Sequence, residues 1–335
     1  MKTKIRIAQI GITSHGQTIL NAILKAPSLE LVALHDLKAQ ESRAMAKKLG
    51  VRHIESYEAI VADSEVDAVA LVTPNHVHAA QMALAIDAGK HIFVEKPISR
   101  TVAEAKSAIA HAKQKGVVLM VGHNTRRRGI FRKSRKVLES GKLGAIVGVE
   151  MNMSRPAGLF GNLPEWKADP RTASLVPMTQ LGIHFVDVVH YLLGPIRQVA
   201  CVANHTAMPG GALDAASAVF RLESGIPAVL SSYYITPDVY SFRIYGTRGI
   251  LSCTVNGVSL QVLKNGTLAT DLEEDFSAEG FASYEEEMEE FGRCVLEGKE
   301  PETGGEGGLA ALAVIEAMTE SLKTGRIIDL KEMFS

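Results

Sequence analysis

The fold is decided by residues 5–16, IRIAQIGITSHG, near the amino terminus. The first six residues are apolar enough to form a buried strand, and Gly11 and Gly16 bracket a turn that opens a helix predicted over 16–25. A strand that passes through a glycine turn straight into a helix is the first βα unit of a parallel sheet.

The alternation of strand and helix continues to residue 122. Further strands are predicted at 29–35, 68–72, 91–94 and 117–121, and further helices at 42–49, 76–88 and 102–114. Their near-continuous apolar character indicates a parallel sheet covered by helices on both faces. The sequence therefore predicts an α/β protein with a Rossmann dinucleotide-binding domain over 1–122.

The second half of the chain has a different rhythm. A helix is predicted at 129–140, a strand within 141–153, and then strands without intervening helices at 199–204, 215–222, 228–234, 240–246, 249–254 and 259–263. Turn signals such as Asn256-Gly257 and Asn265-Gly266 favour an antiparallel meander. With helices at 284–296 and 309–322, we expect a substrate-binding and oligomerisation α/β domain over 123–335, with a large, mostly antiparallel, open-faced sheet.

Composition excludes several classes of protein. The chain has 335 residues, 46% hydrophobic and 22% charged, with a net charge of −1, so we expect neither nucleic acid nor a membrane surface as a partner. Its three cysteines are far apart and suggest no metal site. A strand follows Met1-Lys2-Thr3-Lys4 directly, without the apolar segment of a signal peptide, so we expect a cytoplasmic protein.

The glycine turn is a candidate cofactor site. Dinucleotides need a tight turn, close backbone approach and free amides at the helix N-terminus, and Gly11 and Gly16 meet the first and third glycine positions while Thr13 takes the second. Asp36 ends the second strand, where its carboxylate would bond the ribose hydroxyls and repel a 2′-phosphate, although a turn aspartate is the alternative. NAD is therefore favoured over NADP, with Lys38 as the group that could reverse this preference. Candidate cofactor residues of the turn are Gly11, Thr13, Ser14, His15 and Gly16.

The tripeptide Glu95-Lys96-Pro97 follows the strand at 91–94. A lysine at the carboxyl end of an inner parallel strand points toward the ligand crevice, although a solvated strand-exit lysine is the alternative. Oxidation of an alcohol needs a hydride acceptor and a group that takes the hydroxyl proton. Lys96 is the first candidate for that proton and His184 the second, with Asp187 three residues later on the same helical face.

Together the glycine turn, the E-K-P tripeptide and the segment Gly182-x-His184-x-x-Asp187 resemble the glucose–fructose oxidoreductase/inositol dehydrogenase (Gfo/Idh/MocA) family of nicotinamide-dependent enzymes. The resemblance covers essentially the whole chain. It implies a cis Lys96–Pro97 bond. It also places further residues near the cofactor: Thr73, Pro74, Asn75, His78, Glu95, Lys96 and Asn124.

Residues 122–128, GHNTRRR, are similar to the family's G-x-N-x-R segment. The resemblance implies that Arg126 and His123 contact the substrate, while a solvated basic run is the alternative for Arg126. Arg155 and Trp166 lie in the irregular stretch where the family builds substrate contacts, although Trp166 could equally belong to the core.

Gln180 departs from the family pattern. The family has a carboxylate there, whereas glutamine neither accepts a proton nor stabilises an imidazolium by charge. We therefore expect Lys96, His184, Asp187 and Gln180 at the catalytic site, with Gln180 orienting a substrate hydroxyl and without the carboxylate of the family's usual relay.

The resemblance implies NAD(P)-dependent oxidation of a sugar, sugar acid or cyclitol by a homodimer or homotetramer. Two alternatives stay open. The NAD could be retained during net non-redox chemistry, such as glycoside cleavage or epimerisation, or the chain could be a cofactor-binding sensor with an impaired site.

Overall fold

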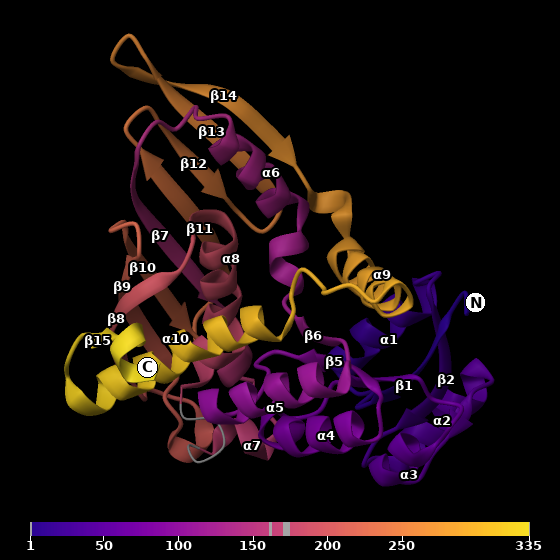
Figure 1. Ribbon diagram of the computed structural model, residues 1–335. Helices are drawn as coiled ribbons and strands as arrows, with labels where there is room; N and C mark the ends of the chain where they lie inside the picture. Colours follow the sequence, from indigo (N-terminus) through magenta and orange to yellow (C-terminus); the bar gives the residue numbers. More distant parts are fainter. Residues whose placement is uncertain (1, 161–162, 170–174, 335) are drawn as a thin grey trace. The chain divides into compact units, whose positions relative to one another are not determined.

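The computed structural model describes residues 2–160, 163–169 and 175–334. The chain forms two compact units, one of residues 1–124 and 281–312 and the other of residues 125–280 and 313–335. We predicted a single division at residue 122, whereas the chain passes between the units three times. Each unit is described by itself below (Figure 1).

The first unit contains a six-stranded parallel sheet in the order β3-β2-β1-β4-β5-β6. This is the doubly wound Rossmann order, and it confirms the predicted fold of the N-terminal half. The strands are β1 (Ile5–Ile10), β2 (Leu29–His35), β3 (Arg52–His53), β4 (Ala68–Leu71), β5 (His91–Glu95) and β6 (Leu119–Gly122). The helices of the N-terminal segment are α1 (His15–Lys25), α2 (Ala39–Leu49), α3 (Tyr57–Ala62), α4 (Asn75–Asp87) and α5 (Val102–Lys115).

Helix α9 (Ala282–Glu297) belongs to this first unit although it comes late in the chain. Its buried Met288 and Phe291 join a core cluster with Ile19 of α1 and Phe93 of β5, and the Phe93 and Phe291 rings meet edge to face at 6.2 Å. Burial of such large apolar side chains stabilises by about 1.5–3 kcal/mol each. This face of α9 explains why the observed unit is not one continuous segment.

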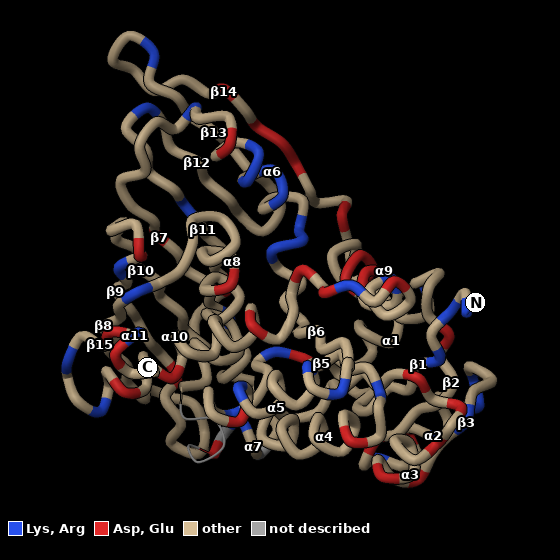
Figure 2. Tube along the Cα trace, in the orientation of Figure 1, with Lys and Arg blue, Asp and Glu red and all other residues tan. Residues whose placement is uncertain are grey.

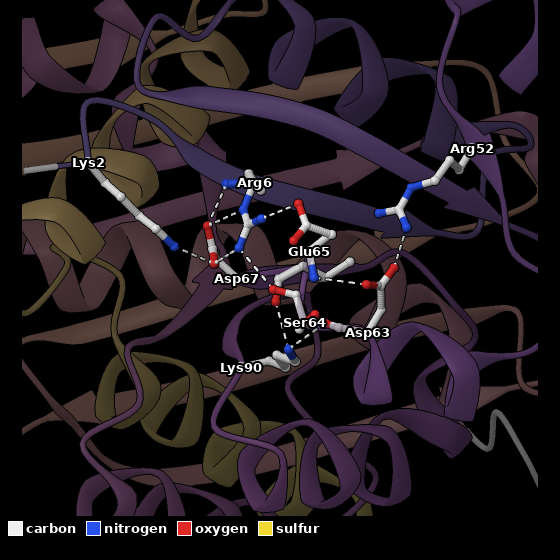
Figure 3. A network of polar contacts seen from close by, with 9 residues as sticks. Lys2, Arg6, Arg52, Asp63, Ser64, Glu65, Asp67 and Lys90 are labelled. Atoms are coloured by element: carbon white, nitrogen blue, oxygen red, sulfur yellow. Dashed lines mark hydrogen bonds and ion pairs between the residues drawn. The ribbon is translucent and has the colours of Figure 1, made fainter.

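The amino ends of the parallel strands are joined by an ionic network (Figure 3). The Arg6 guanidinium donates to Asp67 at 2.9 and 3.1 Å, Lys2 pairs with Asp67 at 2.7 Å, and the Lys90 ammonium donates to the carbonyls of Asp63 and Val66. A cavity of about 510 Å³ opens here. It lies at the strand edge opposite the glycine turn, whereas ligands of parallel sheets bind at the carboxyl ends of the strands, so we do not assign it to the cofactor.

The second unit contains a nine-stranded sheet in the order β14-β13-β12-β11-β7-β10-β9-β8-β15. All its strand pairs are antiparallel except β7 with β10, which confirms a large, mostly antiparallel sheet. The strands are β7 (Ile146–Ser154), β8 (Ile196–Asn204), β9 (Ala215–Leu222), β10 (Pro227–Tyr233), β11 (Val239–Gly246), β12 (Gly249–Cys253), β13 (Gly257–Lys264), β14 (Thr267–Asp275) and β15 (Ile328–Asp329).

One face of this sheet is covered by helices and the other carries exposed side chains. On the covered face, Phe131, Phe185 and Phe242 stack edge to face at 5.2–6.1 Å. On the other face the exposed Val219 lies opposite the exposed Val229 in the β9–β10 pair. The alternation of buried and exposed residues along each strand produces these two faces.

The remaining helical elements are α6 (Gly129–Glu139), α7 (Glu165–Ala168), α8 (Ile183–Leu193), α10 (Gly305–Thr324) and α11 (Leu330–Phe334), with short turns η1 (Asn124–Arg127), η2 (Pro156–Gly158), η3 (Met178–Gly182), η4 (Pro209–Gly211) and η5 (Ser277–Glu279). Among them, η3 and α8 carry the candidate residues Gln180 and His184. Basic residues concentrate on α6 and acidic ones on α9 (Figure 2). Among the described residues, no helix is long and apolar enough to cross a membrane.

Candidate cofactor and reaction site

The glycine turn after β1 is fixed by close contacts with the sheet. Gly11 has φ +86°, and a Cβ there would lie 2.3 Å from the carbonyl oxygen of Val72; a Cβ on Gly16 would lie 2.4 Å from the carbonyl oxygen of Gly11. The buried Gln9 side chain donates to the carbonyls of Gly11 and Gly16 at 2.8 and 2.7 Å. Both glycines are therefore required by space, because a side chain at either position would clash with backbone atoms of the turn and of the segment after β4.

Strain is concentrated at the start of α1. Ser14 has φ 49° and ψ −113°, a conformation that side chains other than glycine rarely adopt. Its side chain does not cap the helix, and the first turn carries no acidic residue that would repel an anion. A strained residue at a helix N-terminus without acidic residues fits a bound diphosphate.

Asp36 lies beside the same turn. One carboxylate oxygen accepts from the Ile12 amide at 2.8 Å and the other from the Lys38 amide at 2.9 Å. The Lys38 ammonium lies 3.3 Å from the carboxylate of Glu41. The carboxylate is thus held at the end of β2, and the one lysine that we predicted could oppose it has an acidic neighbour of its own.

The segment after β4 carries polar side chains that differ in their hydrogen bonding. The Thr73 hydroxyl donates to Gln81 at 2.6 Å, and Pro74 immediately precedes α4. Asn75 is 7% exposed, and its carbonyl oxygen has no hydrogen-bond partner within the described part of the chain. A buried amide oxygen in that state is unfavourable unless a ligand or water donates to it, which fits the predicted place of Asn75 beside the cofactor.

His78 bridges two strand ends. It is 1% exposed, with Nδ1 2.9 Å from the carbonyl oxygen of Pro97 and Nε2 2.9 Å from that of Thr73. Burial lowers the pKa of His78, although both backbone contacts and the charge of Glu95 act to raise it. Because both ring nitrogens face protein carbonyls, His78 supports the cofactor-site loops and does not offer a ring nitrogen to a ligand.

The E-K-P segment is held from both sides, and its Lys96–Pro97 bond is cis, as the family resemblance implied. The Glu95 carboxylate lies 2.9 Å from Nε2 of His15, and its other oxygen accepts from the Lys96 amide at 3.2 Å. Burial acts to raise the pKa of Glu95, but the charges and hydrogen bonds of His15 and Lys96 outweigh it, so this pKa is lowered. Glu95 is therefore a buried anion next to the candidate catalytic lysine.

In the second unit, Gln180 and His184 lie on one continuous helical segment. Gln180 is in η3, a π-helical turn that runs directly into α8, and both side chains are partly exposed. Single π turns often occur at functional sites. Nδ1 of His184 lies 3.0 Å from the Thr125 hydroxyl, so this contact orients the imidazole.

Arg126 and Asp187 form a buried ion pair. The guanidinium donates through Nε to Oδ2 at 2.8 Å and through Nη2 to Oδ1, with side-chain exposures of only 10% and 1%. Arg126 also stacks on the ring of Tyr191, at 5.4 Å. We predicted substrate binding for Arg126 and proton chemistry for Asp187. The structure pairs them with each other, one helical turn after His184, and the two roles stay predictions.

The remaining predicted residues lie in varied surroundings. The Asn124 amide donates to the Ser283 hydroxyl of α9 at 3.1 Å, and His123 is 1% exposed. Arg155 is exposed and Trp166 partly exposed, with the Lys167 ammonium 5.3 Å from the Trp166 ring. Neither Arg155 nor Trp166 is part of the hydrophobic core. Within the described residues, no cluster of His, Cys, Asp and Glu could hold a metal ion.

Sequence reasoning missed Thr125 and the π turn. Thr125 lies inside the quoted GHNTRRR segment, but its contact with His184 spans 59 residues and has no local signal. The π turn has none either, since a glycine-containing helical sequence does not distinguish α from π geometry. The cluster of polar residues between the strand predicted at 117–121 and the helix predicted at 129–140 was the only sequence signal for a site at Thr125.

The chain belongs to the Gfo/Idh/MocA oxidoreductase family. The family model for the NAD-binding Rossmann fold matches residues 5–123, and that for the C-terminal alpha/beta domain matches residues 135–330. This confirms the resemblance inferred from E-K-P and the histidine segment. The protein is therefore an NAD(P)-dependent oxidoreductase.

Similar proteins include enzymes of both cofactor types. The chain is 28% identical over 326 residues to D-xylose 1-dehydrogenase (NADP(+)) 2 of Haloferax volcanii, covering 96% of this chain and 98% of the relative. It is 25% identical over 348 residues to scyllo-inositol 2-dehydrogenase (NAD(+)) of Bacillus subtilis, covering 98% and 97%. The structure of levoglucosan dehydrogenase with NADH and levoglucosan has the same fold, with a TM-score of 0.89, 20% identity and coverage of 97% and 99%. The relatives act on sugars or cyclitols, and they do not decide between NAD and NADP.

Proposed function

We propose that this protein is an NAD-dependent dehydrogenase that oxidises one CH–OH group of a sugar, sugar acid or cyclitol. The observation that carries the proposal is Lys96. It follows an inner strand of the Rossmann sheet, and its neighbours Glu95 and Pro97 are fixed by His15 and His78. A lysine held in this way at the carboxyl end of the sheet is suited to a reacting centre rather than to a solvated strand exit.

The cofactor would be held by polar groups at the carboxyl ends of β1, β2 and β4. The amides at the start of α1 would bind the diphosphate, Asp36 the ribose hydroxyls, and the amide oxygen of Asn75 a donor group. When bound, the nicotinamide supplies the hydride acceptor. Lys96 takes the hydroxyl proton as a neutral amine, His184 exchanges protons as a second base, and Gln180 hydrogen-bonds a substrate hydroxyl.

The preference for NAD is supported by charge. A 2′-phosphate beside Asp36 would meet a carboxylate, and Lys38 already lies close to Glu41. Titration of the purified protein with NADH and NADPH, followed by nucleotide fluorescence, tests this preference. Tighter binding of NADPH would contradict it.

The substrate class is tested with a panel of myo-inositol, scyllo-inositol, D-xylose, levoglucosan and 1,5-anhydroglucitol, with NADH formation followed at 340 nm. Oxidation of at least one compound, lost in Lys96→Met, is the expected result. Inactivity of the wild type on cyclic polyols and sugars would contradict the proposal.

Gln180 favours a second candidate, a cofactor-binding sensor. Glutamine in place of a carboxylate weakens the usual proton relay while leaving the cofactor site intact. The sensor would bind NADH and a polyol without turnover. Cofactor that stays bound through purification, with no net NADH release, would instead favour a non-redox reaction.

We further propose that the enzyme is a cytoplasmic homodimer or homotetramer. The exposed face of the nine-stranded sheet, where Val219 lies opposite Val229, supports association through that face. The buried state of the three free cysteines agrees with a reducing compartment. Light scattering of wild type and Val229→Asp tests the association, and a monomeric wild type would exclude it.

A further inference from the structure

The Glu95 carboxylate, at the end of β5, is both buried and charged. Its side chain is 8% exposed, and its pKa is lowered in spite of burial, so it is charged at neutral pH. A buried carboxylate is costly unless opposite charges and donors surround it. Here the partners are the imidazole of His15 at 2.9 Å and the amide of Lys96 at 3.2 Å.

The surroundings of this carboxylate are shaped to admit it. A Cβ on Gly122, at the end of the neighbouring strand β6, would lie 2.9 Å from Oε1 of Glu95. Glycine at that position therefore leaves room for the carboxylate. The space is specific to the end of β5, where the catalytic lysine is proposed to act.

His15 is the solvent-facing end of the pair. Its side chain is 43% exposed, and its ring meets that of Tyr284 of α9 edge to face at 5.6 Å. Glu95 and Tyr284 of α9 contact His15, while Lys96 and the buried His78 act electrostatically on Glu95. The first turn of α1 has no acidic residue. An imidazole that contacts both a buried anion and solvent can carry a proton between them.

We propose that His15 and Glu95 form a proton-exchanging pair that serves Lys96 and keeps a negative charge beside the nicotinamide end of the cofactor site. This inference rests on the proposed function, because it takes Lys96 to be the group at the reacting carbon. Oxidation of one CH–OH group gives one carbonyl, one hydride and one proton. The hydride goes to the nicotinamide, and the proton goes to the neutral amine of Lys96.

The amine is then restored when its proton passes to His15, directly or through one water, and from His15 to solvent. Glu95 stays a carboxylate throughout, and its oxygen 2.9 Å from Nε2 of His15 orients the ring. The pair supplies next to Lys96 the carboxylate–histidine chemistry that Gln180 cannot supply beside His184. It also favours the positively charged oxidised cofactor over the neutral reduced one.

The test uses His15→Gln and Glu95→Gln, with His111→Gln as the matched control. His111 of α5 also pairs with a carboxylate, Asp87 of α4, at 3.1 Å. Both residues lie near the C-terminal ends of their helices, away from the sheet edge where we place the cofactor. Dissociation constants for NAD⁺ and NADH are measured for each variant from pH 5.5 to 9. Where the wild type oxidises a member of the substrate panel, the pH profile of kcat/KM is measured as well.

We expect NADH affinity to stay within about threefold, while Glu95→Gln weakens NAD⁺ relative to NADH by roughly tenfold, because one nearby charge is lost. Both variants should move the base limb of the kcat/KM profile, and His111→Gln should match the wild type. An unchanged NAD⁺/NADH ratio in Glu95→Gln, or superimposable profiles, would overturn the inference. Failure of the proposed function has a different signature: the panel is not oxidised, while the binding ratio still reports on Glu95.

Discussion

Replacement of Asp187 by asparagine should destabilise the second unit strongly. The change keeps the size of the side chain but removes the negative charge from a pair whose side chains are 10% and 1% exposed. Loss of one partner from such a buried pair costs about 3–5 kcal/mol, because the Arg126 guanidinium stays buried without its counter-charge. For a domain of this size each kcal/mol lowers Tm by about 2–4 °C, so we expect a decrease of about 6–20 °C.

The assay combines thermal unfolding with hydrogen exchange of the α8 peptide, because a chain with two units need not unfold in one transition. Glu139→Gln is the control. It removes a surface pair with Arg135, 46% and 62% exposed, and should lower Tm by no more than about 1–2 °C. The double variant Arg126→Met, Asp187→Leu should regain most of the loss, since neither buried charge remains. A Tm within 2 °C of the wild type, or a double variant less stable than Asp187→Asn, would refute the reasoning.

Further outcomes can be measured independently. Lys96→Met should abolish turnover and leave the NADH dissociation constant within a few fold, because the lysine acts on the substrate proton rather than on the dinucleotide. His184→Ala should reduce kcat/KM much more than Gln180→Ala, and Gln180→Asp should raise the pH of the base limb, since a new negative charge favours the imidazolium. Asp214 should contribute acid-sensitive stability. Burial acts to raise its pKa, but three backbone amides of residues 206–208 lower it overall. Its contribution is thus present above the ordinary aspartate range and is lost as pH falls through the lowered value, so urea midpoints should fall less steeply with acid in Asp214→Asn.

The fold could be predicted wherever burial imposes a regular pattern of apolar residues on the sequence. Apolar runs such as 68–72 and alternating strands such as 215–222 gave the right elements, because a strand's buried face constrains every second residue. Strand β14 was missed. Its residues TLATDLEED are mostly exposed at the edge of the sheet, so burial imposes no apolar alternation on them.

The allocation of α9 could not be predicted from its own sequence. Its amphipathic pattern shows that one face is buried, but not which unit buries it, and that depends on α1 and β5. The same limit applies to the site. Residue types singled out Arg126, His184 and Asp187 as candidates. Only the three-dimensional structure reveals that Arg126 and Asp187 bind each other and that Thr125 contacts His184.

Catalysis and mere cofactor binding require different unfavourable local features. Both need a dinucleotide site, and the strained Ser14 belongs to the turn that we propose for it. Only catalysis needs an imidazole of fixed orientation in the second unit. There the π turn, the contact of Thr125 with His184 and the ion pair of Arg126 with Asp187 all act on one short stretch of helix, and a desolvated ion pair is a poor way to gain stability alone. Such energetically unfavourable local features are concentrated at functional sites, where side chains must be held in a defined orientation. These features agree with catalysis by the oxidoreductase, and we propose that Gln180 modifies its proton transfer rather than abolishing it.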